Sequence, residues 1–130
     1  MPGVAETVRR VKAAGVAVCV ASQGKLAKTR LSLKLTKLDD LFPDDVLFSA
    51  YSVPRGKPHP DLFLHASQAM AAEPTRCAVI EDTPSGVTAA VAAGMRAFGY
   101  AADSDAAALR EAGAELFGAM EELAGLLRVG

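Results

Sequence analysis

The sequence predicts an α/β fold in which a parallel β-sheet is covered by helices on both faces. Helix-like and strand-like segments alternate along the whole chain, without low-complexity tracts or an internal repeat. The run VAVCVA at residues 16–21 is entirely apolar and rich in valine, which is typical of a strand buried on both faces. A chain of 130 residues has the size of one domain, so we expect residues 1–130 to form a single domain.

The first half of the chain is expected to contain two helices and two strands. Val4, Val8 and Val11 would line one face of a first helix that ends at Gly15. After the strand at 16–21, a second helix carries leucines at positions 26, 31, 35 and 38. A short strand near 46–48 then leads into the loop VPRGKPHP, residues 53–60.

The second half continues the alternation. Pro60 opens a helix with apolar residues at positions 62, 63, 66 and 70. The strand CAVIED (77–82), the helix PSGVTAAVAAG (84–94) and the strand MRAFGY (95–100) follow. Weaker patterns predict a helix at 106–112, a strand at 115–117 and a closing helix at 120–127.

Composition and charge exclude several classes of partner. The chain is 51% hydrophobic and its formal net charge is -1, which argues against a surface built for nucleic acid or anionic lipid. Cys19 and Cys77 lie far apart within apolar runs, as expected of reduced core cysteines. No segment is long and apolar enough for a signal peptide or a membrane span. We therefore expect a cytoplasmic protein without a nucleic-acid or membrane partner.

Polar residues follow two of the predicted strands, and open parallel sheets bind ligands beyond the carboxyl ends of their strands. Ser22 follows the strand at 16–21, where it could bind an anion or cap the next helix. Glu81 and Asp82 end the strand at 77–82. Two adjacent carboxylates repel each other, so we expect them to be solvated, to be stabilised by the N-terminus of the next helix, or to be neutralised by a cation. Lys57, between a glycine and a proline, is a cation held at a fixed point or a solvated loop residue.

Two other patterns do not match known sites. Gly24-Lys25 and Gly56-Lys57 lack the earlier glycine and the following Ser or Thr of a phosphate-binding P-loop. His59 and His65 flank a helix start at a spacing that metal sites do not use.

Ser22, GKPHPD at 56–61 and IEDTPSGVTAAVAAGM at 80–95 together resemble the phosphatase-like branch (subfamily I) of the haloacid dehalogenase superfamily. The resemblance covers essentially the whole chain. It implies a three-layer Rossmann-like core with a parallel sheet.

The same resemblance implies roles for individual residues. Ser22 and Gln23 would bind the phosphoryl group, and Lys57 would stabilise its charge. Asp82, supported by Glu81, would hold Mg²⁺. Ser22 and Lys57 are thus the expected catalytic residues of this chain.

The sequence departs from the family at its nucleophile. The family's nucleophile is the first aspartate of an Asp-x-Asp-Gly-type motif that closes the first core strand, and no such motif occurs here. We expect the chain to lack this strand and the helical cap, so the sheet would have a gap between the strands ending at Ser22 and at Glu81. Direct pairing, a strand from another chain, or a longer parent protein would resolve the gap. We expect the last, with this piece unstable alone.

The expected function is that of a Mg²⁺-dependent phosphatase of small phosphorylated metabolites such as a sugar phosphate, acting through an aspartyl-phosphate in the complete enzyme. This chain alone is expected to be inactive. A phosphomutase resembling β-phosphoglucomutase shares every residue visible here, and a non-catalytic binding or regulatory domain is the alternative from another class. The identity of the substrate and the oligomeric state cannot be read from the sequence.

Overall fold

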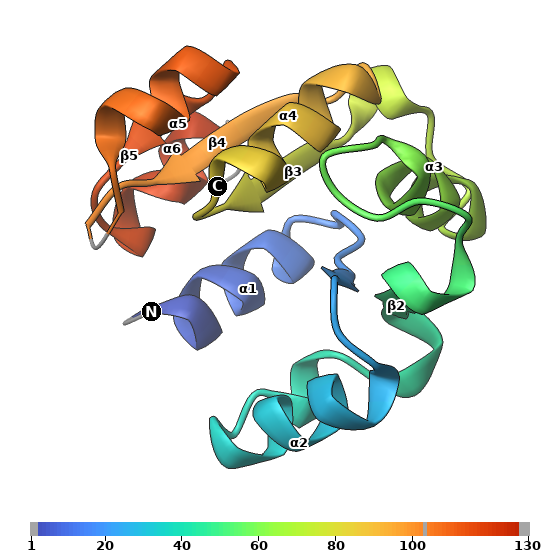
Figure 1. Ribbon diagram of the computed structural model, residues 1–130. Helices are drawn as coiled ribbons and strands as arrows, with labels where there is room; N and C mark the ends of the chain where they lie inside the picture. Colours follow the sequence, from blue (N-terminus) through green and yellow to red (C-terminus); the bar gives the residue numbers. More distant parts are fainter. Residues whose placement is uncertain (1–2, 103, 128–130) are drawn as a thin grey trace.

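A computed structural model describes residues 3–102 and 104–127 and confirms the α/β fold with parallel strands (Figure 1). The strands form two sheets. One pairs β1 (Val20–Ser22) with β2 (Leu47–Ser49), and the other has the order β3 (Ala78–Glu81), β4 (Arg96–Tyr100) and β5 (Glu115–Phe117). Every pairing is parallel. The predicted sequence of elements is therefore confirmed.

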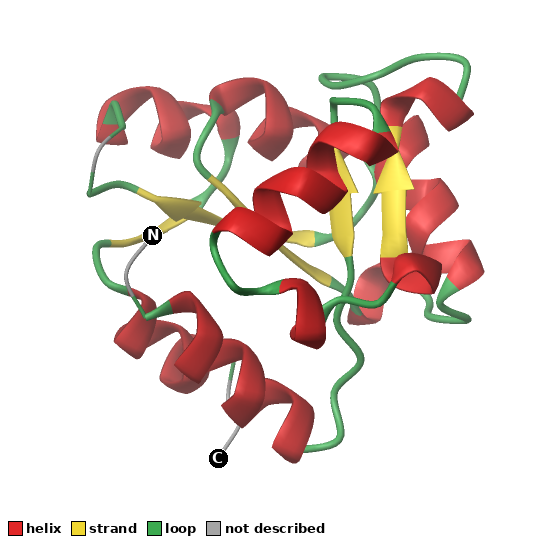
Figure 2. Ribbon diagram, turned by 90° about the horizontal axis from the view of Figure 1, so that it is seen from below, coloured by secondary structure: helices red, strands yellow, loops and turns green. Residues whose placement is uncertain are grey.

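Helices cover both faces of the three-stranded sheet (Figures 1 and 2). Alternate residues of β4 point to opposite faces: Ala97 belongs to the core beneath α4 and α5, whereas Phe98 belongs to the core beneath α1 and α6. The helices are α1 (Val4–Ala13), α2 (Leu26–Leu35), α3 (Asp61–Ala69), α4 (Pro84–Ala92), α5 (Ala106–Ala112) and α6 (Leu123–Leu126). None of the helices in the described residues is long and apolar enough to span a membrane.

The two sheets are not hydrogen-bonded to each other. In the described residues β1 pairs with β2 and β3 pairs with β4, with no pairing between β1 and β3. Direct pairing of 16–21 with 77–81, one way of closing the expected gap, therefore does not occur. Both strands keep an edge whose N–H and C=O groups have no strand partner, which is costly in a sheet interior.

The structure also corrects the prediction that residues 16–21 form a fully buried strand. Only Val20 and Ala21 of that run are in the sheet, and Val16 is 43% exposed rather than buried on both faces. The reason is that β2 is three residues long, so its ladder reaches only Val20–Ser22.

Two helices hold the sheets together from opposite sides. On one face, Val4 of α1 packs against the core of the three-stranded sheet, while Val8 packs against the core beside β2. On the other face, Phe63 of α3 belongs to the core under α4, while Leu62 packs with Phe48 of β2. These contacts of α1 and α3 join the two sheets, although no strand pairing connects them.

The leucines of α2 do not all lie on its buried face. Thr29 and Leu33 are buried, whereas Leu31 and Leu35 are 57% and 73% exposed. Thr29 and Leu33 are one turn apart and Leu33 packs beside Leu47 of β2, so the contact with the sheet selects this face.

Candidate active site

Ser22 is the last residue of β1 and lies at the carboxyl end of its sheet. Its Oγ accepts a hydrogen bond from the backbone N–H of Gly24 at 3.1 Å. Ser49, its register partner at the end of β2, donates from Oγ to the carbonyl of Gly24 at 2.6 Å and is only 2% exposed. The loop after β1 is therefore fixed from both sides before any ligand arrives.

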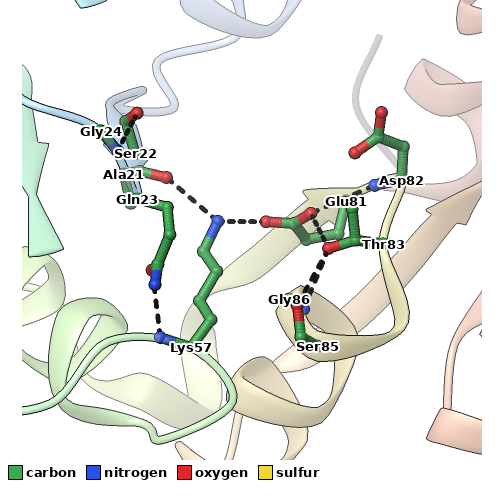
Figure 3. A network of polar contacts seen from close by, with 10 residues as sticks. All are labelled: Ala21, Ser22, Gln23, Gly24, Lys57, Glu81, Asp82, Thr83, Ser85 and Gly86. Carbon is green, nitrogen blue, oxygen red and sulfur yellow. Dashed lines mark hydrogen bonds and ion pairs between the residues drawn. The ribbon is translucent and has the colours of Figure 1, made fainter.

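Lys57 connects the two sheets at this end (Figure 3). Its Nζ donates to the carbonyl of Ala21 in β1 at 3.4 Å and forms an ion pair with Glu81 Oε2 of β3 at 2.5 Å. The side chains of Lys57 and Glu81 are only 11% and 10% exposed. The ring of Phe63 lies beneath the ammonium, with its centroid 5.2 Å from Nζ. A sheltered cation thus sits between the ends of β1 and β3.

The loop that carries Lys57 is attached to the loop after β1 through Gln23. The Oε1 atom of Gln23 accepts a hydrogen bond from the backbone N–H of Lys57 at 3.1 Å. A Cβ on Gly56 would lie 2.5 Å from Gln23 Nε2, so the glycine allows the amide to lie against this backbone.

Glu81 is held by partners within the protein. Besides the ion pair with Lys57, its Oε1 accepts hydrogen bonds at 3.2 Å from the Thr83 hydroxyl and at 3.2 Å from the backbone N–H of Asp82. Thr83 Oγ1 also accepts from the N–H of Gly86, which caps α4. A Cβ on Gly86 would overlap the Glu81 carboxylate. The start of α4 is therefore shaped around this side chain.

Asp82 has a different environment from Glu81. It is exposed, and its carboxylate lies apart from the ion pair of Lys57 with Glu81 (Figure 3). The two neighbouring acids thus differ in their contacts, and the cation that neutralises Glu81 is Lys57.

The donor set suits Mg²⁺ only in part. No group of three or more His, Cys, Asp or Glu side chains that could hold a metal occurs in residues 3–102 and 104–127. Mg²⁺ is commonly held by one or two carboxylates, with waters and substrate phosphate oxygens completing the octahedron. The exposed Asp82 carboxylate fits such a site, whereas Glu81 is occupied by Lys57 and Thr83.

The structure brings the predicted residues to one end of the two sheets. It links Lys57 directly to Glu81 and to the loop of Ser22 and Gln23, and Asp82 lies beside Glu81 with its carboxylate apart from this pair. Sequence reasoning missed Ser49, although its signal was the same as that of Ser22, a serine directly after a short apolar strand.

The chain is similar in sequence and in fold to known phosphatases and hydrolases. Hexitol phosphatase A of Escherichia coli is 31% identical over 111 residues, which are 85% of this chain and 50% of that protein. A HAD family hydrolase from Deinococcus radiodurans, solved with bound phosphate and sodium, has a TM-score of 0.91 and 35% identity and matches 98% of this chain and 59% of that one. A Thermotoga maritima protein proposed to be a β-phosphoglucomutase has a TM-score of 0.88 and 31% identity, covering 98% and 59% of the two chains.

These matches also define how much of a relative the chain represents. It spans half the length of hexitol phosphatase A. A model of the haloacid dehalogenase-like hydrolase family matches residues 1–94, which include Ser22, Lys57 and the pair of acids. On this match, the chain belongs to the haloacid dehalogenase-like hydrolase family.

Proposed function

We propose that this chain is the phosphate-binding part of a Mg²⁺-dependent phosphatase that acts on small phosphorylated metabolites such as sugar or polyol phosphates. The observation that carries the proposal is the sheltered ammonium of Lys57 between the ends of β1 and β3, beside the fixed loop of Ser22. A preorganised cation and hydrogen-bond donors at a strand end are what a phosphoryl group requires. The relationship to hexitol phosphatase A supports the substrate class.

The residues would divide the work by their chemistry. The Ser22 hydroxyl would donate to a phosphoryl oxygen while its oxygen still accepts from the Gly24 N–H, and Gln23 lies in the same loop. Lys57 would offset the charge that develops on the equatorial oxygens. Asp82 would hold Mg²⁺, which supplies electrostatic stabilisation of the phosphoryl oxygens when bound. Glu81 would hold the Lys57 ammonium in place.

The nucleophile belongs to the part of the protein outside this chain in our proposal. An aspartate there would attack phosphorus, the alcohol of the substrate would leave, and water would hydrolyse the aspartyl-phosphate. The unpaired edges of β1 and β3 support this assignment, because a strand between them would satisfy both edges and end beside Lys57. Residues 1–130 would then be one core domain without its central strand.

A phosphomutase is the second candidate, favoured by the similarity to the Thermotoga maritima protein. It would use the same residues of this chain and return the phosphoryl group to the sugar.

A cytoplasmic location, consistent with the free Cys19 and Cys77, completes the proposal.

The test is an assay of a longer form of the protein that contains the preceding strand. With Mg²⁺ and a panel of hexose and hexitol phosphates, we expect release of inorganic phosphate that falls by several orders of magnitude in Lys57→Met. Conversion of one sugar phosphate isomer to another without phosphate release would replace the phosphatase with a mutase. No turnover of either kind, with a folded protein, would contradict both and favour a binding domain.

A further inference from the structure

We infer that Gln23 is a positioning residue that couples the loop after β1 to the loop carrying Lys57; its effect on phosphate binding rests on the proposed function. The family resemblance implied a direct contact between Gln23 and phosphate. In the structure its Oε1 instead accepts a hydrogen bond from the backbone N–H of Lys57, 34 residues further along the chain. This contact joins two loops that no strand pairing connects.

The approach of the two loops depends on Gly56. A Cβ there would lie 2.5 Å from Nε2, 2.9 Å from Oε1 and 3.0 Å from Cδ of Gln23. Real Cβ atoms do not approach other atoms so closely, so any larger residue at this position must displace the amide. Because that amide is the end of a flexible side chain, Gly56→Ala should move Gln23 without unfolding the chain.

The neighbours of Gln23 make it an effective coupling residue. On one side Gly24 is fixed by hydrogen bonds to Ser22 Oγ at 3.1 Å and from the buried Ser49 Oγ at 2.6 Å. On the other side Lys57 is held at both ends, by Gln23 at its backbone and by Glu81 at Nζ. The Ser22 hydroxyl and the Lys57 ammonium are thus positioned together before a phosphoryl group binds, which lowers the ordering cost of binding.

A positioning role and a direct phosphate contact predict different effects of substitution. Gln23→Ala removes the acceptor, whereas Gln23→Glu keeps an oxygen that can accept from Lys57 N–H. In the positioning role the glutamate variant therefore retains the protection of the Lys57 amide that the alanine variant loses. If Gln23 acted only by direct contact with phosphate and did not hold Lys57, neither substitution would change the exchange of this amide.

The experiment measures hydrogen exchange of the Lys57 amide by NMR in the full chain, with the Ala108 amide, which donates to Asp105, as internal control. We use trimethylamine N-oxide to keep every variant folded. We expect Lys57 exchange to accelerate about 2- to 10-fold in Gln23→Ala, as for the loss of one hydrogen bond, and to stay at the wild-type rate in Gln23→Glu. Ala108 should not change in any variant.

Gly56→Ala supplies the matched second variant. Alone it should accelerate exchange at Lys57 as Gln23→Ala does, and in the Gln23→Ala background it should add nothing, because no amide remains to be displaced.

A wild-type exchange rate at Lys57 in Gln23→Ala, or equal acceleration in the alanine and glutamate variants, would overturn the inference. Titration with orthophosphate separates the two claims: a wild-type chain that binds none would contradict the proposed function and leave the exchange result to decide the role of Gln23.

Discussion

The ion pair between Lys57 and Glu81 should contribute far more to stability than an ordinary surface pair. It holds Glu81 of β3 to the ammonium that also donates to Ala21 of β1, where no backbone pairing connects the two strands, and its side chains are 11% and 10% exposed. Lys57→Met leaves the Glu81 carboxylate sheltered without its cation. Removing one partner of a buried pair costs about 3–5 kcal/mol, a large share of the roughly 5–15 kcal/mol that stabilises a domain.

The matched control is the pair of Arg30 with Asp44. Its N–O distance is 2.9 Å, but the two side chains are 48% and 71% exposed. Exposed pairs contribute about 0–1 kcal/mol, so Arg30→Met should cost no more than that. Both substitutions remove one cation and keep a long apolar side chain, so the difference between them reports on burial.

Urea unfolding, monitored by circular dichroism, measures the free energy of unfolding that each substitution removes. Trimethylamine N-oxide is present to give each variant a folded baseline. Adding Glu81→Gln to Lys57→Met should recover part of the loss, because the unpaired charge is then removed. If Lys57→Met and Arg30→Met differ by less than about 1 kcal/mol, the ion pair does not hold the two sheets together as we describe.

Three further predictions concern other parts of the chain. Burial raises the pKa of the Cys19 thiol, and the nearby Cys77 raises it further, so iodoacetamide at pH 7.5 should alkylate Cys19 much more slowly in the folded chain than in urea; equal rates would contradict this. The hydrogen bond from Arg55 lowers the pKa of Asp61 below its ordinary 3.8. The stability that the pair adds is therefore present above pH about 4 and is lost as the pH falls through the lowered pKa. The melting temperatures of wild type and Arg55→Gln should therefore differ at pH 6 and converge in stronger acid, and a constant difference would argue against the pair. The chain without its preceding strand should not hydrolyse p-nitrophenyl phosphate with Mg²⁺, and turnover abolished by Asp82→Asn would refute the assigned nucleophile.

Local signals were sufficient to predict the order of elements and the strand ends at which the candidate residues lie. Pro84 and the cap residue Thr83 start α4 directly after β3, so the acids had to lie at a strand end. Contacts between distant segments were not predictable. The extent of β1 depends on the short β2, and the exposure of Leu31 depends on which side of α2 meets that strand. Gln23 gave no sign of its partner, because that partner lies in a loop without periodicity.

The central claim is that the end of the sheets around Lys57 binds phosphate together with Mg²⁺. Isothermal titration calorimetry of orthophosphate into the folded chain, with and without Mg²⁺, tests it most directly. We expect phosphate to bind to the wild type and Mg²⁺ to strengthen binding. Asp82→Asn should remove only the Mg²⁺-dependent gain, whereas Ser22→Ala should weaken binding in both conditions. A wild-type chain that binds no phosphate, or an Asp82→Asn variant that keeps the full gain from Mg²⁺, would contradict it.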